Sequence, residues 1–268
     1  MRVLFIGDIV GRVARKFAYE QIQKFKKNKL VDLIIVNVEN AAGGFGVTPE
    51  ICEEFYNSGS DILTSGNHIW DKKEIISYIN KNQKLLRPLN MVEGSPGNGI
   101  VIIETKFGKI GIANLMTNLY MIKSNDMFKF VPNILQKLSL NTDLKFSLVD
   151  VYGEASSEKM ALGHILDGNV SAVVGTHTHV PTSDYRILEN GTAYITDVGM
   201  SGDYNSIIGM EKETAINRFL KVGKSKPLEV SKGEPTLCGV LIVTKKDGLA
   251  KSIRPIRIGG KLTSANFK

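Results

Sequence analysis

The sequence has little of several features, and each scarcity removes a class of protein. Only Cys52 and Cys238 occur in 268 residues, far apart and without ligand-like spacing, so neither a disulfide framework nor a zinc ribbon is supported. No apolar run reaches the roughly 18 residues of a membrane-spanning helix, and Asp8 comes too early for a signal peptide. We expect buried free thiols, a cytoplasmic protein and no membrane partner.

What is present is the composition of a folded globular protein. Hydrophobic residues make up 43% of the chain and charged residues 23%, and no linker or repeat divides it. We therefore expect one domain over residues 1–268. The net charge of +7 comes from scattered Lys and Arg, which favours solvated surfaces and would also attract a small anionic phosphate ester.

The first half of the sequence alternates short apolar strands with helices. Strands are expected at 2–7, 33–38 and 61–64. Thr48 and Pro49 predict the start of a helix that ends near Gly59, and Asp71 with Glu74 resembles a capping pair for the next helix. A one-sided stripe predicts the first helix, through Val13, Phe17, Gln21, Ile22 and Phe25. The pattern is β-α-β-α-β, which is typical of parallel strands in a layered α/β domain.

The second half continues with strands at 146–150 and 171–174 and adds hairpins. Segments 99–104 and 109–114 flank a turn, and residues 188–192 carry a second hairpin signal. Further strands are expected at 239–244 and 252–258. Apolar spacing predicts helices at about 127–138, 157–167 and 211–220.

Polar residues follow the predicted strands at four independent places. They are Asp8, then Glu39 with Asn40, then Asn67 with His68, and finally His177 with His179. In open α/β sheets ligands bind beyond the carboxyl ends of the strands, so these residues are expected to converge. Amide and carboxylate oxygens suit divalent cations, and an imidazole can protonate a leaving oxygen. The pattern indicates a metal site that cleaves phosphate esters.

Each motif also has a simpler interpretation. Asp8 alone would more often be a turn or capping residue, and Asn67-His68 alone resembles a strand-to-helix connection. His177 and His179 would face the same side of an extended chain, which favours ligands over core packing. His164 is expected to be a structural residue on a helix flank.

Together the motifs resemble a known family, the YmdB-type calcineurin-like metallophosphoesterases, bacterial 2′,3′-cyclic-nucleotide 2′-phosphodiesterases. The likeness covers nearly the whole chain. It rests on the segments Gly7-Asp8-Ile9-Val10-Gly11, Glu39-Asn40-Ala41-Ala42, Gly66-Asn67-His68, Trp70-Asp71-Lys72-Lys73-Glu74, 172–179 and 193–200. It implies a four-layer α/β/β/α sandwich with a centre of two metal ions, iron or else manganese. By position, the resemblance implies that the first metal is held by Asp8, Glu39, Asn40 and His179, and that Glu39 bridges to a second metal held by Asn67 and His177.

The sequence departs from the family pattern at two places. Tyr152, in Asp150-Val151-Tyr152-Gly153-Glu154-Ala155, stands where family members have a histidine ligand. A phenol must lose its proton to ligate well, which a trivalent iron favours more than a divalent ion does, so we expect a weaker or more selective second site. The segment 114–118 also differs, which bears on the substrate and not on the fold.

The resulting hypothesis is hydrolysis of a cyclic phosphodiester, 2′,3′-cyclic and also 3′,5′-cyclic. Two ions roughly 3.5–4 Å apart would bridge a hydroxide, and His68 would protonate the leaving ribose oxygen. Asp71 and Asp197 would support the ligands as partners of their side chains. Two alternatives stay open. One is a ribonuclease-like activity on RNA at the same centre, and the other is a regulatory module with a degenerate one-metal site that binds a nucleotide or a protein. Homo-oligomers are also compatible with the sequence.

Overall fold

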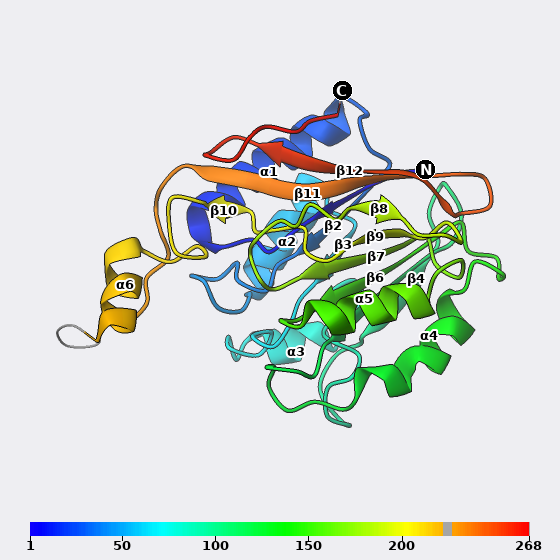
Figure 1. Cartoon of the computed structure of the whole chain (residues 1–268), viewed down its shortest axis with the longest axis horizontal. Coiled ribbons are helices and arrows are strands. Elements are labelled where there is room, and N and C mark those ends of the chain that lie inside the picture. Colours follow the sequence, from blue (N-terminus) through cyan, green and yellow to red (C-terminus); the bar gives the residue numbers. More distant parts are fainter. Residues whose placement is uncertain (222–226, 268) are drawn as a thin grey trace.

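Two six-stranded sheets packed face to face form the centre of the computed structural model, which describes residues 1–221 and 227–267 (Figure 1). The first sheet has the order β10-β11-β1-β2-β3, with β12 paired to β11. The parallel strands β1, β2 and β3 confirm the predicted β-α-β-α-β unit. The strands of this sheet are β1 (Arg2–Ile6), β2 (Leu33–Asn37), β3 (Ile62–Thr64), β10 (Gly202–Asp203), β11 (Pro235–Thr244) and β12 (Ala250–Ile258).

The second sheet has the order β4-β5-β6-β7-β9-β8. Strands β5, β6, β7 and β9 run parallel, and the two predicted hairpins appear as the antiparallel pairs β4–β5 and β8–β9. The strand predicted at 146–150 extends two residues further, which brings Tyr152 into the sheet. The strands are β4 (Ile100–Ile103), β5 (Ile110–Met116), β6 (Phe146–Tyr152), β7 (Ala172–Thr176), β8 (Arg186–Ile187) and β9 (Ala193–Ile195).

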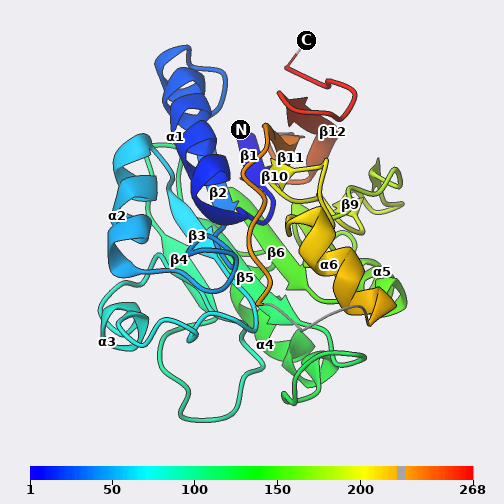
Figure 2. The same ribbon diagram turned by 90° about the vertical axis from the view of Figure 1, so that its left-hand side faces the viewer.

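Helices cover the outer faces of the two sheets. Helices α1 (Gly11–Lys27) and α2 (Pro49–Ser58) lie side by side against the first sheet, and α4 (Val131–Leu138) and α5 (Ser156–Ile165) cover the second (Figure 2). Helix α6 (Lys212–Leu220) projects from the body of the protein (Figure 1). The short α3 (Ile75–Ile79) and the 3₁₀ turn Met127–Phe130 complete the set. These layers confirm the expected α/β/β/α sandwich.

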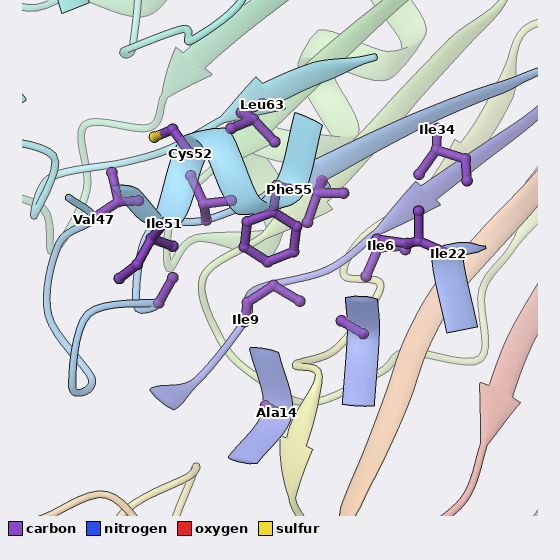
Figure 3. Close-up of a cluster of buried hydrophobic side chains, with 14 of the residues drawn as sticks. Ile6, Ile9, Ala14, Ile22, Ile34, Val47, Ile51, Cys52, Phe55 and Leu63 are labelled. Carbon is purple, nitrogen blue, oxygen red and sulfur yellow. The ribbon is translucent and has the colours of Figure 1, made fainter. Parts of the chain in front are cut away.

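Successive apolar side chains on a strand point to opposite faces of the sheet, and this explains why each sheet is covered on both sides. On β1, Val3 and Phe5 point between the sheets, while Leu4 and Ile6 point toward the helices. Figure 3 shows Ile6 and Ile34 of the first sheet beside Ile22 of α1 in the outer core, to which Ala14 of the same helix also belongs. Because each fully buried Leu, Ile or Phe contributes about 1.5–3 kcal/mol, these layers are the main source of stability.

Three details of the predicted helices were wrong. The buried stripe of α1 runs through Ala14 and Ala18, and Val13 is exposed, because the helix turns its small residues toward the first sheet. The helix predicted at 127–138 begins as a 3₁₀ turn, and only α4 is α-helical. The expected Asp71–Glu74 capping pair does not form: Glu74 is the N-cap of α3 without a side-chain bond, and Asp71 contacts His68 instead.

Other predictions about the chain are confirmed. Helix α2 begins with Thr48, whose hydroxyl accepts a hydrogen bond from the Ile51 amide, and ends at Gly59 in the left-handed conformation. Cys52 and Cys238 are buried free thiols. In residues 1–221 and 227–267, no helix combines the length and the apolar character that crossing a membrane requires.

Candidate active site

The ends of five strands bring the candidate residues together. Asp8 follows β1, Glu39 and Asn40 follow β2, Asn67 and His68 follow β3, His177 and His179 follow β7, and Tyr152 is the last residue of β6. Parallel strands place their carboxyl ends at the same edge, and here two stacked sheets supply residues to one centre.

Glu39 is the buried hub of this centre. Its two carboxylate oxygens accept hydrogen bonds from the backbone amides of Gly66 and His68, and the Tyr152 hydroxyl donates a further one. Asn67 lies between the two residues whose amides contact Glu39. The strand-end loop after β3 is therefore wrapped around one carboxylate.

Asp8 contributes a second buried carboxylate to the centre. One carboxylate oxygen of Asp8 accepts a hydrogen bond from the His177 amide at 3.2 Å. Among the described residues, the other oxygen, Oδ1, has no hydrogen-bond partner although it is fully buried. A buried carboxylate oxygen without a donor is costly unless a cation is near it.

The side chain of His179 is oriented by a backbone carbonyl. Its Nδ1 atom donates to the carbonyl oxygen of Ile208 at 2.7 Å, which leaves the lone pair on Nε2. That atom lies 3.3 Å from Oδ1 of Asn40, and the amide group of Asn40 is fixed because its Nδ2 donates to Gly44. Two acceptors face one another, and this arrangement is stable when a cation lies beside both.

The loop after β7 differs from the extended chain that we expected. His177 and His179 have φ angles of 97° and 65°, in the left-handed region that is strained for residues with a side chain. The two imidazoles are therefore directed to the centre by a tight turn and not by the alternation of a strand. Thr178, between them, donates its amide proton to the buried carboxylate of Asp197 at 3.0 Å, and this contact holds the turn.

His68 lies at the edge of the centre and is paired with a carboxylate. Its Nδ1 atom is 2.7 Å from Oδ2 of Asp71, and the ring of Phe45 packs against it with centroids 5.0 Å apart. The side chains of His68 and Asp71 are partly exposed, whereas those of Glu39 and Asp8 are buried. Because Nδ1 of His68 is hydrogen-bonded to Asp71, the Nε2 atom of His68 can exchange a proton with a bound molecule.

Tyr152 is buried against three members of the site. Its ring lies so close to Gly66 that a Cβ added to this glycine would overlap the ring carbons, and its centroid is 4.6 Å from that of His177. Burial raises the pKa of its phenol well above 10, and the charge of Glu39 raises it further. The phenol is therefore neutral and acts as a donor.

Burial sets the charge states of the other groups. It raises the pKa of Asp8 to about 6, and, together with the proximity of Asp8, it raises the pKa of Glu39 to about 8. Burial and, to a smaller extent, the charge of Lys159 lower the pKa of His177 to about 4. A cation between these groups would stabilise the ionised carboxylates and the neutral imidazole.

The donor set fits one cation well. In residues 1–221 and 227–267, no group of three or more His, Cys, Asp or Glu side chains is arranged to hold a metal ion. A cation site here would therefore include the amide oxygen of Asn40. Asp8 Oδ1, Asn40 Oδ1 and His179 Nε2 are acceptors without donors between them, and Glu39 lies beside them. Oxygen and imidazole ligands suit iron, manganese or another divalent ion.

Two buried residues that the sequence reasoning missed support this centre. Asp150 accepts hydrogen bonds from Thr64 at 2.5 Å, Thr176 at 2.7 Å and Asn37 at 3.1 Å, and thus joins β6 to β3, β7 and β2. Burial raises its pKa to about 7. A carboxylate inside the apolar strand 146–152 was the available signal.

Lys159 is the second missed residue. It is fully buried on α5, and its Nζ donates to the carbonyl of Thr176 at 2.7 Å and to Asp197 at 3.1 Å. Asp197, a predicted supporting residue, also accepts from the amide of Gly199 at 2.9 Å. No sequence pattern distinguished Lys159 from a surface lysine. His164, in contrast, is exposed on α5, as expected for a residue outside the site.

Comparison with solved structures defines the class of the protein. A novel phosphatase from Mycoplasma pneumoniae superimposes with a TM-score of 0.88 at 33% identity, covering 97% of this chain and 93% of that one. A 5′-nucleotidase precursor from Thermus thermophilus shares the fold alone, with a TM-score of 0.54 at 10% identity over 96% of this chain and 54% of that one. The fold is that of the metallophosphoesterases and nucleotidases.

Sequence comparison then gives the family. The model of the YmdB-like proteins matches residues 4–256, and the chain belongs to this family. A 2′,3′-cyclic-nucleotide 2′-phosphodiesterase from Bacillus subtilis (strain 168) is 44% identical over 242 residues, which cover 90% of each chain. The expected resemblance and the expected phosphoesterase class of enzyme are confirmed.

Proposed function

We propose that the protein is a metal-dependent phosphodiesterase that hydrolyses cyclic nucleotides, with 2′,3′-cyclic nucleotides as its first substrates and His68 as proton donor. The observation that carries the proposal is the link between two groups. Acceptors on Asn40 and His179 face one another, and Asp8, which interacts electrostatically with His179, has a buried carboxylate oxygen without a partner. Glu39 accepts the backbone amide of His68. A cation site and an acid are thus held at a fixed separation.

The residues divide into two sets around Glu39. Asp8, Asn40 and His179 would hold the first cation together with Glu39, and Asn67 and His177 would face a second. Iron or manganese suits these ligands, and when bound the cations would activate water and offset charge on the phosphoryl group.

His68 donates the proton, a step that needs a protein side chain and no cation. Asp71 accepts the Nδ1 proton of His68, so the imidazole is held in one orientation with Nε2 available. A 2′,3′-cyclic phosphate opens when the bond from phosphorus to the ribose 2′ oxygen breaks, and that oxygen needs a proton. His68 would donate it, and general acid catalysis of this kind contributes about 10²- to 10⁴-fold in rate. The 44% identity to the Bacillus subtilis phosphodiesterase supports this substrate.

The test compares substrates on one metal-loaded preparation. We expect turnover of 2′,3′-cyclic nucleotides to exceed that of 3′,5′-cyclic nucleotides and of a short RNA. Faster cleavage of RNA would support the ribonuclease-like alternative. Binding of nucleotide without hydrolysis, at any cation count, would support a regulatory module.

A variant of the proposed acid separates catalysis from metal binding. His68→Ala should lower kcat about 10²- to 10⁴-fold with unchanged metal content. His164→Ala is the matched control because this histidine is exposed on α5, outside the site. A parallel loss of bound metal in His68→Ala would show that His68 is a ligand and not the acid.

A further inference from the structure

We infer that Tyr152 limits this centre to one tightly bound divalent cation, because its ring and hydroxyl occupy the side of Glu39 that a second cation would need. The inference rests on the proposed metal centre and concerns how many cations it holds. It does not depend on which phosphodiester is the substrate.

The hydrogen bonds of Glu39 give the first reason. An ionised carboxylate offers about four lone-pair directions. The amides of Gly66 and His68 donate to two of them, one on each oxygen, and the hydroxyl of Tyr152 interacts with the same carboxylate and competes for the two that remain. A carboxylate that bridges two cations needs both remaining directions, whereas one suffices for a single cation.

The position of the Tyr152 ring gives the second reason. Three of its carbons would overlap a Cβ built on Gly66, so the ring is packed directly against that backbone. On its other side the ring meets His177, at an interplanar angle of 61°. Tyr152 is 1% exposed, and it therefore fills the space between Gly66, Glu39 and His177.

The environment of His177 gives the third reason. Its Nε2 atom lies 3.2 Å from Oε2 of Glu154, a partly solvated carboxylate at the edge of the site. A second cation that used this nitrogen would have to break that contact. Of the residues expected at the second site, Asn67 would then be the one that binds a cation without giving up another contact. One amide oxygen is too little for tight binding.

Cation stoichiometry provides the test. The chain would be stripped with a chelator and titrated with Mn²⁺, with bound ions counted by calorimetry and their coupling read from the electron paramagnetic resonance spectrum. We expect one tight site and the spectrum of isolated Mn²⁺. In Tyr152→His, an imidazole acceptor replaces the phenol donor, and we expect two tight sites and the spectrum of a coupled pair.

Tyr152→Phe isolates the hydroxyl, because it keeps the ring and removes only the donor to Glu39. We expect the second Mn²⁺ to bind about tenfold more tightly than in the unaltered chain, since a hydrogen bond to a charged group contributes on this scale. Tyr56→Phe is the matched control, because its hydroxyl contacts Asn82 at 3.3 Å, away from the centre. It should leave both binding constants unchanged.

Three outcomes would overturn the inference. They are two equally tight sites in the unaltered chain, a single site in a folded Tyr152→His, and an unchanged second Kd in Tyr152→Phe. If Tyr152→His does not fold, the Phe variant decides. Failure of the proposed function would look different, because it would be absence of cyclic-nucleotide hydrolysis at any cation count.

Discussion

The Nε2 atom of His179 and the Oδ1 atom of Asn40 face each other at 3.3 Å, and neither carries a proton to donate. Neither side chain can rotate away, because the imidazole donates a hydrogen bond to the carbonyl of Ile208 and the amide donates one to the carbonyl of Gly44. We therefore expect the stability of the protein to respond to cations independently of any substrate.

Removal of metal should therefore lower the stability of the fold. A ligand at 100 times its Kd stabilises by about 2.7 kcal/mol, and for a chain of this size that corresponds to roughly 5–10 °C in Tm. We expect a chelator to lower Tm by about this amount and added Mn²⁺ to restore it, measured by scanning calorimetry. His179→Ala should abolish the response to Mn²⁺, and a persistent response would contradict the assigned site.

Loss of the carboxylate beside His68 should affect turnover and not metal binding. In Asp71→Asn the carboxylate oxygen 2.7 Å from Nδ1 of His68 is replaced by an uncharged amide, which can turn its NH2 group toward the ring and no longer fixes one orientation or tautomer. Supporting partners of this kind contribute about 10- to 100-fold in activity, so kcat should fall by that factor. Glu74→Gln is the control, since Glu74 makes no side-chain bond at the N-cap of α3. An unchanged kcat in Asp71→Asn would show that His68 is oriented without Asp71.

The buried ion pair beneath the histidine turn should be important for folding. Lys159→Met would leave Asp197 buried without its cation, and breaking such a pair costs about 3–5 kcal/mol of unfolding free energy. Urea unfolding measures this loss. The double variant Lys159→Met/Asp197→Asn should be less destabilised than Lys159→Met, because no charge remains buried.

Lys109→Met provides the comparison for an exposed pair. Its partner is Asp143, and both side chains are solvated, so the loss of stability should be much smaller than in Lys159→Met. Equal losses in Lys159→Met and Lys109→Met would contradict the structural role of the buried pair.

The pH dependence of stability should reveal a contact at the opposite end of the sheet. Burial of Asp32 acts to raise its pKa, but hydrogen bonds from the side chain and amide of Arg2 lower it below the usual value. A lowered carboxyl pKa adds stability above the unfolded value of about 3.9, and that stability is lost as the pH falls through the folded value. Asp32→Asn should therefore be less stable than the unaltered chain at pH 7.

The difference between Asp32→Asn and the unaltered chain should shrink as the pH falls below about 4 and toward the lower folded pKa of Asp32, because the aspartate of the unfolded chain is protonated first. Thermal melts between pH 3 and pH 7 measure it. Glu20→Gln, a change at an exposed position of α1, should show no such trend. A gap that widens toward low pH would contradict the sign derived for Asp32.

The sequence was sufficient for the parts of the fold that depend on local patterns. Apolar runs and helix caps predicted β1, α2 and the parallel unit, because the hydrophobic period and the turn residues act over a few neighbours. The stacking of one sheet on the other depends on long-range contacts, and only the family resemblance predicted it.

The candidate site also combines features that local sequence patterns predict with features that depend on long-range contacts. The polar residues after the strands predicted which elements meet, but not how each side chain is held. The sequence allowed Asp71 to be either a helix cap or a partner that supports a ligand, and the structure instead pairs it with His68. The left-handed turn at His177 and His179 follows from contacts with Asp8 and Asp197, which are distant in sequence. The metal, the cytoplasmic location, the single domain and oligomerisation stay predictions.

Asp150 has a consequence for how this protein can change over time. Its hydrogen bonds to Asn37, Thr64 and Thr176 tie the ends of strands from both sheets together immediately below the centre. The spacing between residues supplied by the two sheets is thus set by three short polar contacts and not by the volume of the apolar interface. We therefore expect volume-conserving substitutions deeper between the sheets to leave the dimensions of the catalytic edge unchanged.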